Sequence, residues 1–587
     1  MASISPLLRR VGPSHSSITV TLLMSCSKAL ACDVLGGLIA HFWFNKHEPE
    51  VSWSFFAIVA LAPVPSAWML FEHMSAQQAA LIAYPLFIVT LLTSISIYRA
   101  SPWHPLAEYP GPFLCKLTQF WNVWVMWGGK QHVYRLWMHE KYGPIVRIGP
   151  NELSIVDKEL MPSILGPQGM PKGPLNADKR LTPASEKHKD DYSLQGCRDS
   201  QRHAKLRKAW SKAFTNSPMK DYEELMLQRA LQLIETLDKF CRDSPDGYGH
   251  VDISKWINFF SYDFMGDLIF GGGFELMRDG DKDGLWHSME TAIIYPAMCQ
   301  HIPWFSPILR ILPFVGAPMR AFAKFALHHA TVRSTKEPKR KDLFYHITEA
   351  TLSDMDSGIS AFPLIVSNAV LAITAGSDTV ASVLSGIMYY ILANPADYAR
   401  LKEEVDRAFP PNEVSVIGSE AFAKMPFLHA VVREGLRLQP AVPSSLQRAP
   451  EIGTGGKIVG SHYFKEGTMV TCAPFAQHRD PRYFSPSPNT FWPERWIKTS
   501  GGVSTEDGVI CDRSAFIPFS YGPANCVAKP LAMIELQTAV LLFVMNFDMS
   551  FDDGFVPKSW EDNLKDFFSM QKGELMAKLK PRDRIKL

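Results

Sequence analysis

Residues 519–529 read FSYGPANCVAK, a loop with one glycine and one proline that carries a single cysteine, Cys526. An apolar helical pattern follows from Pro530 to Phe547, so the cysteine is expected just ahead of a helix N-terminus. Unpaired backbone N–H groups and the positive end of the helix dipole stabilise a thiolate there. Gly522 and Pro523 would shape a turn whose amides face the sulfur. Taken alone, the stretch fits either a metal-ligating cysteine or a structural cysteine at the start of a core helix.

The composition of the chain limits the classes of protein to which it can belong. Its 587 residues could form two to four average domains, or one large domain with a membrane anchor. The 60 basic residues nearly balance the 58 acidic ones, so the charge indicates no nucleic-acid partner. The nine cysteines show no CxxC spacing, which argues against a disulfide scaffold or a zinc site and favours a reducing compartment.

The first hundred residues have the character of a membrane anchor. Residues 51–71 and 76–98 each supply ~20 uncharged residues, enough to cross a bilayer as a helix. The run 18–44 is a weaker candidate because it carries Lys28 and Asp33 near its middle. Basic residues precede the two better segments and Arg99 follows them, which predicts a two-helix hairpin with both flanks in the cytosol. If residues 18–44 also span the membrane, the N-terminus lies on the opposite side.

The chain divides into three predicted regions, and the third holds most of the secondary structure. Residues 1–100 form the anchor, residues 101–112 a stiff proline-rich linker, and residues 113–587 the body. Near the start of the body, residues 142–157 read as a β-hairpin around a Gly-Pro-Asn turn. The segment 160–200 is polar and interrupted by proline and glycine, so long loops with a short helix are expected there.

Helical patterns dominate the rest of the body. Residues 201–214 predict a strongly basic amphipathic helix with His203 and Arg207 one turn apart on one face. Residues 301–316 are apolar and broken by proline, which favours a membrane-touching or substrate-channel loop over a core helix. Small strands are expected around residues 461–473 and in the C-terminal tail.

The longest apolar pattern of the body covers residues 362–393, about 45 Å of helix at 1.5 Å per residue. A pattern that is apolar on most faces indicates a buried central helix or a membrane span. Its middle reads Ala-Gly-Ser-Asp-Thr at residues 375–379, and such a polar group would be costly at the centre of a bilayer. A buried helix with a local distortion at this point is therefore the better interpretation.

Two further patterns place charged residues in apolar surroundings. Residues 426–438 predict a helix with Glu434 and Arg437 three positions apart, close enough to share one face. Residues 491–496 read FWPERW, an aromatic stretch that contains Arg495. A surface ion pair worth a few tenths of a kcal/mol is the alternative interpretation of the first pair.

Together these pieces resemble, in order and spacing, the cytochrome P450 family of haem-thiolate monooxygenases, and in texture its fungal membrane-bound members. The resemblance covers about residues 105–587 and implies a mainly α fold with small β-sheets, behind an N-terminal membrane anchor. Each motif alone is common, but the set is highly specific. The family patterns are [AG]-G-x-[DE]-T, Glu-x-x-Arg, a Pro-Glu-Arg-Phe-like segment and F-x-x-G-x-R-x-C-x-G. The matching residues are, in that order, Ala375, Gly376, Asp378 and Thr379; Glu434 and Arg437; Arg495; and Phe519, Gly522 and Cys526.

The cysteine loop departs from the family pattern at two positions. Ala524 stands where an arginine usually helps to hold a haem propionate. Ala528 stands where a glycine usually lets the following helix pass close to the porphyrin. The first change removes one cation and the second adds one methyl group, and neither removes the iron ligand.

The resemblance implies haem b with the Cys526 thiolate as its protein ligand, a donor that favours O–O bond cleavage. Asp378 and Thr379 would deliver protons on the distal side of the haem. The propionates require paired cations, and the family pattern implies Arg207, His203 and, as a further candidate, Arg448. Glu434, Arg437 and Arg495 are implied as a buried charge triad that stabilises the haem-binding core rather than as catalytic groups.

The resemblance also implies an electron donor, a substrate class and a location for the protein. No flavin or nicotinamide segment is visible, so electrons would come from a separate NADPH-cytochrome reductase in the same membrane. Expected contacts for that partner are Lys529, Lys205, Lys208 and Lys212. The implied reaction consumes O2 and oxidises an apolar small molecule, such as a terpenoid of secondary metabolism. The implied location is the endoplasmic reticulum membrane, with the catalytic body in the cytosol.

Two other functions remain open at this point. A haem-thiolate isomerase or dehydratase would need neither O2 nor a reductase, but the Asp378 and Thr379 pair argues against it. A membrane receptor or transporter with a helical cytosolic body would leave the four motifs unexplained. The substrate pocket of an oxygenase is expected among residues 160–200, 300–316, 370–374 and 441–446.

Overall fold

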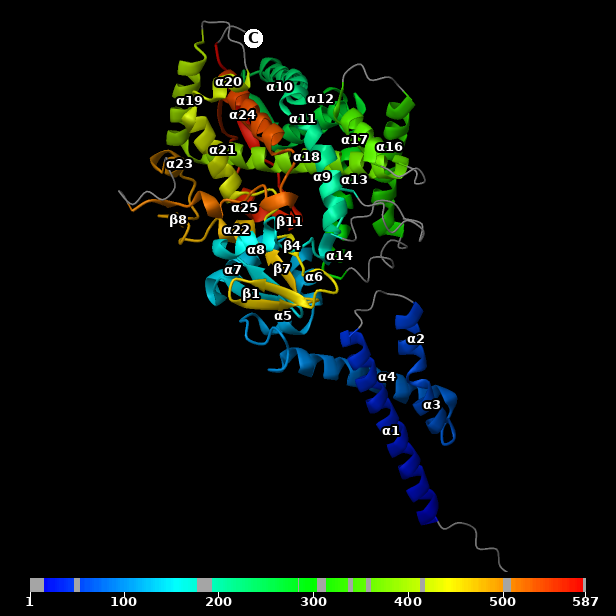
Figure 1. The fold of residues 1–587 in the computed structure, drawn as a ribbon. Coiled ribbons are helices and arrows are strands. Elements are labelled where there is room, and N and C mark those ends of the chain that lie inside the picture. Colours follow the sequence, from blue (N-terminus) through cyan, green and yellow to red (C-terminus); the bar gives the residue numbers. More distant parts are fainter. Residues whose placement is uncertain are drawn as a thin grey trace, which may run out of the picture. The chain divides into compact units, whose positions relative to one another are not determined.

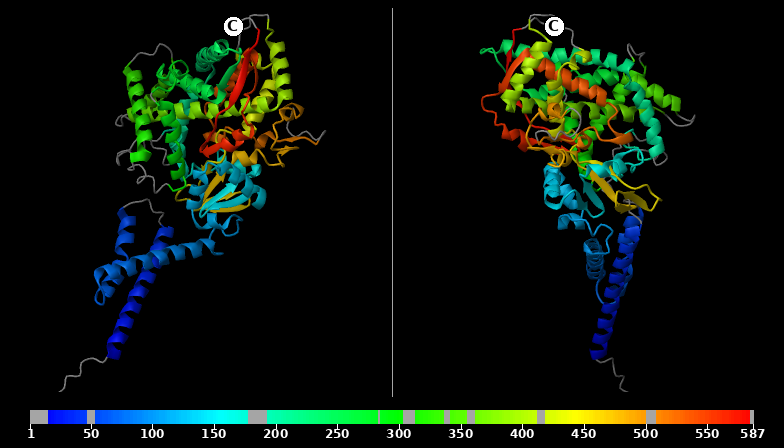
Figure 2. Two further views of the ribbon diagram at one scale, coloured as in Figure 1. Left: turned by 180° about the vertical axis from the view of Figure 1, so that it is seen from behind. Right: turned by 60° about the vertical axis from the view of Figure 1, so that its left-hand side comes forward.

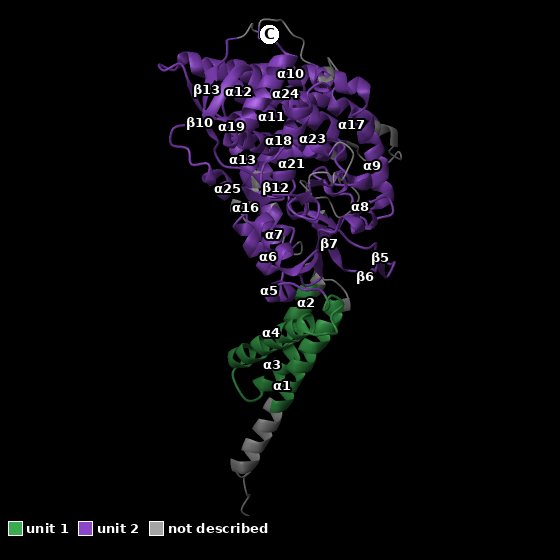
Figure 3. Ribbon diagram, turned by 90° about the vertical axis from the view of Figure 1, so that its left-hand side faces the viewer, with its two compact units in different colours: residues 1–108 green, residues 109–587 purple. Residues whose placement is uncertain are grey.

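The fold is known from a computed structural model of the chain. It describes residues 15–46, 53–176, 193–282, 284–302, 313–335, 341–354, 361–411, 418–499 and 508–583. The chain forms two compact units, residues 1–108 and residues 109–587 (Figure 3). The second unit is mainly helical with small sheets, as the sequence predicts.

The described part of the first unit contains four helices: α1 (His15–Lys46), α2 (Trp53–Leu61), α3 (Val64–Phe71) and α4 (Ala76–Ala100). The segment 51–71, predicted as one spanning helix, is divided in the structure between α2 and α3. Pro63 and Pro65 explain the break, since proline lacks the N–H of a helical hydrogen bond and clashes with the preceding turn. Neither piece is long enough to cross a bilayer alone, at 1.5 Å per residue.

The weaker candidate of the sequence, residues 18–44, lies within a single helix, α1. Within this unit α1 packs against α3 and α4, and the Ser66 hydroxyl of α3 donates to the buried Asp33 carboxylate of α1. This contact accounts for a charged residue in the middle of an otherwise apolar run. The α4 helix is long and apolar enough to cross a membrane, and 17% of its most apolar window is buried within the unit.

The long helices of the second unit gather on one side of it, and most of the strands gather on the other (Figure 1). These helices are α9 (Ser200–Ala213), α10 (Asn216–Asp243), α11 (Ile253–Phe270), α16 (Pro313–Thr335), α17 (Leu343–Asp354), α18 (Ala361–Ala393), α19 (Pro395–Ala408), α21 (Pro426–Leu438) and α24 (Lys529–Asn546). Three shorter helices lie beside the strands: α5 (Phe113–Leu117), α6 (Phe120–Trp127) and α7 (Gln131–Tyr142).

The largest sheet has four strands in the order β1-β2-β7-β4. The predicted hairpin is confirmed as antiparallel β1 (Ile145–Gly149) and β2 (Glu152–Ile155). The β2 strand then pairs in parallel with β7 (Met469–Cys472), which pairs antiparallel with β4 (Leu446–Arg448). The smaller sheets comprise β10 (Phe547–Phe551), β13 (Met576–Pro581) and β3 (Gly249–Asp252); β11 (Lys565–Phe567) and β12 (Ser569–Gln571); β5 (Gly456–Val459) and β6 (His462–Lys465); and β8 (Phe484–Ser485) and β9 (Ile510–Cys511).

The α18 helix is the central element of the second unit. It packs against α11, α24, α21 and α17, and in both views of Figure 2 it runs through the middle of the helical region. Two thirds of its most apolar window is buried, although its length and hydropathy alone would suit a membrane span. The choice of a buried helix over a membrane span is therefore confirmed, and the helix continues without a break through residues 375–379.

The segment 301–316 is only partly described. Residues 303–312 of the expected apolar loop lie outside the described residues. From Pro313 onward the chain is already helical as part of α16, so the expected loop is wrong for residues 313–316. Proline fits the first turn of a helix, where its missing N–H would have no partner in any case.

Candidate active site

The cysteine loop is fixed by a glycine that no other residue could replace without strain. Gly522 has φ +73°, and a Cβ atom there would lie 2.0 Å from the Leu165 carbonyl oxygen. The loop then forms a short 3-10 turn over Gly522–Ala524. Beyond it the Cys526 amide donates to the Phe519 carbonyl oxygen at 2.9 Å, which closes the loop onto itself. The glycine of the motif therefore shapes the loop, and the phenylalanine closes the loop through its carbonyl oxygen and also lines the cavity.

Cys526 lies three residues before Lys529, the first residue of α24, as the sequence predicts. The Cys526 side chain is exposed to the cavity that it lines. Burial raises the pKa of the Cys526 thiol, while hydrogen bonds from the Ala528 and Lys529 amides and the charge of Arg207 act to lower it. These amides are the donors at the helix start that would stabilise a thiolate.

Arg207 of the basic helix α9 reaches the residue beside the cysteine. One terminal nitrogen, Nη2, donates to the Asn525 side-chain oxygen at 2.7 Å, and Nη1 donates to the Asn525 carbonyl oxygen. The two contacts join residues 318 positions apart in the chain. Asn525 was missed at the level of sequence because asparagine in a glycine- and proline-containing loop has an ordinary role in turns.

The α18 residues of the site face different neighbours. Thr379 lines the cavity, and its hydroxyl donates to the Ala375 carbonyl oxygen at 2.6 Å. The Asp378 carboxylate accepts a hydrogen bond from the Tyr262 hydroxyl of α11 at 2.6 Å, and burial raises the pKa of Asp378. Gly376 serves the packing of the two helices, because a Cβ atom there would lie 2.6 Å from the Met265 sulfur.

The predicted propionate residues His203, Arg207 and Arg448 all line the same cavity, together with a fourth basic residue, Lys172. Burial, together with the nearby Lys172, Arg207 and Arg448 charges, lowers the pKa of His203 to about 3. The imidazole is therefore neutral at physiological pH and can donate one N–H. Within the described part of the chain, no ion pair joins Lys172, Arg207 or Arg448 to a carboxylate.

The cavity has a volume of about 450 Å³ and lies between α18 and the start of α24. Its lining is mostly apolar, with residues such as Leu268, Ile293, Ala297, Phe322, Leu371 and Leu536. Members of the expected pocket segments contribute Leu194, Gln300, Thr374 and Leu446. The lining thus includes parts of all four stretches that the sequence predicts, although residues 177–192 and 303–312 lie outside the described residues.

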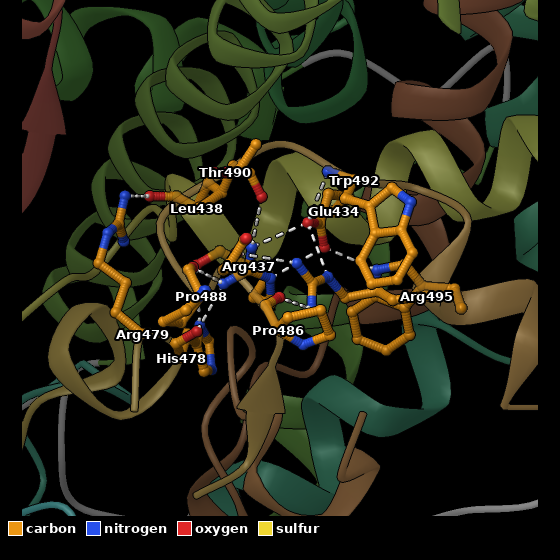
Figure 4. Close-up of polar contacts among 12 residues, drawn as sticks. Glu434, Arg437, Leu438, His478, Arg479, Pro486, Pro488, Thr490, Trp492 and Arg495 are labelled. Carbon is orange, nitrogen blue, oxygen red and sulfur yellow. Dashed lines mark hydrogen bonds and ion pairs between the residues drawn. The ribbon is translucent and has the colours of Figure 1, made fainter. Parts of the chain in front are cut away.

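Glu434, Arg437 and Arg495 form a closed charge triad, as expected. Figure 4 shows the Glu434 carboxylate between the two guanidinium groups. Its oxygens accept hydrogen bonds from Arg437 Nε and Nη2 at 2.8 Å each and from Arg495 Nε at 3.0 Å. All three side chains have 0% exposure. The alternative of a surface ion pair is excluded by this burial.

Aromatic and backbone groups complete the triad. The Trp496 indole N–H and the Trp492 backbone N–H each donate to Glu434 at 2.9 Å. Arg437 also donates to the carbonyl oxygens of His478, Pro488 and Thr490 (Figure 4). Burial acts to raise the pKa of Glu434, but the charge of Arg437, with Arg495 and the hydrogen bonds, holds it below its ordinary value. The carboxylate is thus fully paired, which is the condition under which a buried ion cluster is stable.

The cavity residues fit a haem b group. Cys526 can supply a thiolate ligand, the apolar lining suits the porphyrin, and the unpaired cations suit two anionic propionates. Among the described residues, no group of three or more His, Cys, Asp or Glu side chains could hold a bare metal ion. This combination of side chains fits a haem-thiolate site.

Comparisons with known proteins agree with this class. The family model described as Cytochrome P450 matches residues 106–578, so the chain belongs to the cytochrome P450 family. Similar proteins include the tryprostatin B 6-hydroxylase of Neosartorya fischeri, 29% identical over 82% of this chain and 84% of the relative. Cytochrome P450 67 of Uromyces fabae is 30% identical over 91% of this chain and 96% of the relative. Cytochrome P450 monooxygenase lcsI of Purpureocillium lilacinum is 30% identical over 87% of this chain and 96% of the relative.

Proposed function

We propose that this protein is a membrane-bound, haem-dependent monooxygenase that oxidises an apolar small molecule with O2 and electrons from a separate NADPH-cytochrome reductase. The observation that carries the proposal is one cavity lined by Cys526, Thr379 and the cations Lys172, Arg207 and Arg448, which form no ion pair with a carboxylate among the described residues. Haem bound there supplies the oxidation chemistry, and the protein supplies orientation and protons. A family relative named for the 6-hydroxylation of tryprostatin B supports hydroxylation of a secondary metabolite.

The chain's own residues would act in three ways. Arg207, His203 and Arg448 would bind the haem carboxylates and so fix the position of the ring. The apolar lining would exclude water and orient the substrate. Thr379 and Asp378 would hold and move protons from the α18 side, with Tyr262 orienting the carboxyl group of Asp378.

The substrate would enter a cavity in which apolar side chains predominate, so we expect an apolar compound such as a terpenoid. The test is turnover of candidate compounds by full-length protein with a fungal reductase and NADPH under 18O2. One 18O atom in the product is expected. Product that forms without O2 or NADPH would instead identify a haem-thiolate isomerase or dehydratase.

The reductase would approach the side of the unit that carries the cysteine loop. The contacts of Arg207 with Asn525 place α9 beside this loop, and Lys205, Lys208, Lys212 and Lys529 are exposed there. A positive surface suits an acidic partner and makes association dependent on ionic strength. Lys208→Glu should slow reductase-dependent reduction and leave the spectrum of the haem unchanged, and an unchanged reduction rate would contradict this docking surface.

The proposed location is the endoplasmic reticulum membrane, with the catalytic unit in the cytosol. The apolar α4 helix supports a membrane anchor. In the second unit, α5 and α6 expose Phe113, Trp124 and Trp127, each more than 60% accessible, which suits a position at a membrane interface. Alkaline extraction and protease protection of intact microsomes would test this. The catalytic unit should be digested from outside while the protein stays with the membrane, and a protected catalytic unit would contradict it.

A further inference from the structure

Lys172, which the sequence did not single out, stands directly beside Arg448 in the wall of the cavity. The two residues form an antiparallel β-bridge. Backbone hydrogen bonds flank the bridge on both sides, from Gly173 N–H to Gln447 O at 3.2 Å and from Ala449 N–H to Pro171 O at 3.1 Å. Residues directly opposite each other in an antiparallel pair project their side chains to the same side. Both side chains accordingly line the cavity.

Among the described residues, the acceptors of the Lys172 ammonium group are neutral carbonyl oxygens. It donates to the carbonyl oxygens of Leu194 at 2.7 Å and Gln195 at 3.0 Å. An ammonium group has three N–H donors, so one remains for a further acceptor. Burial and then the charges of Arg448 and Arg207, which repel it, lower the pKa of Lys172 to about 7, while Cys197 acts to raise it. A buried cation among other cations is stable only when an anion joins them.

The cysteine loop lacks a cation that would pair with a haem propionate. Ala524 lines the cavity at the position where the family pattern has a propionate-binding arginine. Arg207, the neighbouring cation, uses one N–H of each terminal nitrogen for Asn525, so only its remaining N–H groups can serve a propionate. A haem with two propionates would therefore find one cation fewer on the loop side than the family pattern supplies.

We propose that Lys172 replaces the charge missing at position 524 and, together with Arg448, binds a haem propionate. This rests on the proposed function, namely that the cavity holds haem b. Because Lys172 also holds the carbonyl groups of Leu194 and Gln195, haem binding and the position of this part of the cavity wall are linked through one side chain.

The experiment uses full-length haem-loaded protein and four variants: Lys172→Met, Lys172→Arg, the double variant Lys172→Met/Ala524→Arg, and Lys239→Met as a control on the exposed face of α10. The readouts are the rate of haem transfer to excess apomyoglobin and the ferric/ferrous midpoint potential. Lys172→Met should lose haem about tenfold faster or more, as a lost charge-assisted hydrogen bond implies. Its midpoint potential should fall, because removing a nearby cation favours the more positive ferric state.

Lys172→Arg, the double variant and Lys239→Met should all retain haem nearly as well as the unaltered protein. Unchanged haem loss and potential in Lys172→Met would overturn the proposal. So would fast haem loss that Ala524→Arg does not reduce, since Lys172 would then act only by holding the 194–195 carbonyl groups. If Lys172→Met yields no haem-loaded protein, recovery of holoprotein in the double variant supports the proposal and failure to recover it opposes it. An unaltered protein that binds no haem would instead contradict the proposed function.

Discussion

The catalytic unit contains two buried groups of basic side chains, and they differ in how their charge is balanced. In the triad, one carboxylate from Glu434 accepts hydrogen bonds from both guanidinium groups and from two tryptophan N–H groups. In the cavity, Lys172, Arg207 and Arg448 contact carbonyl and amide oxygens, and the described residues offer them no ion pair. A balanced cluster is complete as soon as the chain folds, whereas an unbalanced one is complete only with an anionic ligand. The difference separates a structural role from a binding role without reference to any family.

The largest effect is expected where the balanced cluster is broken. Glu434→Ala leaves two buried guanidinium groups without a carboxylate, which should lower the free energy of unfolding by about 3–5 kcal/mol. The purified variant should contain little or no haem, as measured by its absorbance relative to total protein. Asp553→Asn is the control, because its partner Lys578 lies at 3.4 Å and the Asp553 side chain is 89% exposed. Normal haem content in Glu434→Ala would show that the triad does not hold the core together.

Removing a cation from the unbalanced cluster should act on the ligand rather than on the fold. Arg448→Met removes a side chain that, among the described residues, donates to the Gln447 carbonyl oxygen at 3.0 Å. The rate of haem transfer to apomyoglobin should rise, corresponding to about 1.5–3 kcal/mol of lost binding. The free energy of unfolding of the apoprotein, measured in urea, should fall far less in Arg448→Met than in Glu434→Ala. A variant that unfolds easily but holds haem normally would reverse the distinction between the two clusters.

Glu535 of α24 is a buried acid that forms no ion pair among the described residues. Burial raises the pKa of Glu535 to about 8, and its described partner is the Ser261 hydroxyl. The folded protein binds the proton of the Glu535 carboxyl group more tightly than the unfolded chain does. The protonated carboxyl group therefore stabilises the folded protein at low pH. This stabilisation is lost as pH rises from about 4.5 to about 8.

Glu535→Gln should therefore flatten the fall in stability between pH 5 and pH 8, measured as the urea midpoint of the haem-loaded protein. At pH 5 the variant and the unaltered protein should be nearly equal, since both then carry a neutral group. Parallel pH profiles for the two proteins would mean that this carboxyl group titrates normally.

The smallest effect on stability and haem retention is expected for Thr379→Ala, because Thr379 belongs to neither cluster. Its hydroxyl contacts only the Ala375 carbonyl oxygen of its own helix among the described residues, so unfolding should change by about 1 kcal/mol or less. The effect should appear in coupling instead, as a larger share of NADPH oxidation that ends in hydrogen peroxide. Normal coupling in this variant would argue against a role for Thr379 in proton delivery.

The sequence predicts the long helices well because their hydrophobic periods are regular. Residues 426–438 and 362–393 were assigned almost to the residue, and Glu434 with Arg437 follows from helical spacing alone. The segment 51–71 shows the limit of composition, since its apolar character hid the break that Pro63 and Pro65 impose. Contacts between distant parts of the chain could not be predicted without a fold. Lys172 beside Arg448, Tyr262 on Asp378 and Asn525 on Arg207 are such contacts.

The account depends most directly on Cys526 as the ligand of a haem iron. The decisive measurement is the absorption spectrum of the reduced, carbon-monoxide-bound protein, compared with that of Cys526→Ser. The unaltered protein should show the strongly red-shifted Soret band of thiolate ligation, and Cys526→Ser should lose it together with turnover. The same red-shifted band and full turnover in Cys526→Ser would contradict the assignment of this cysteine and the chemistry that depends on it.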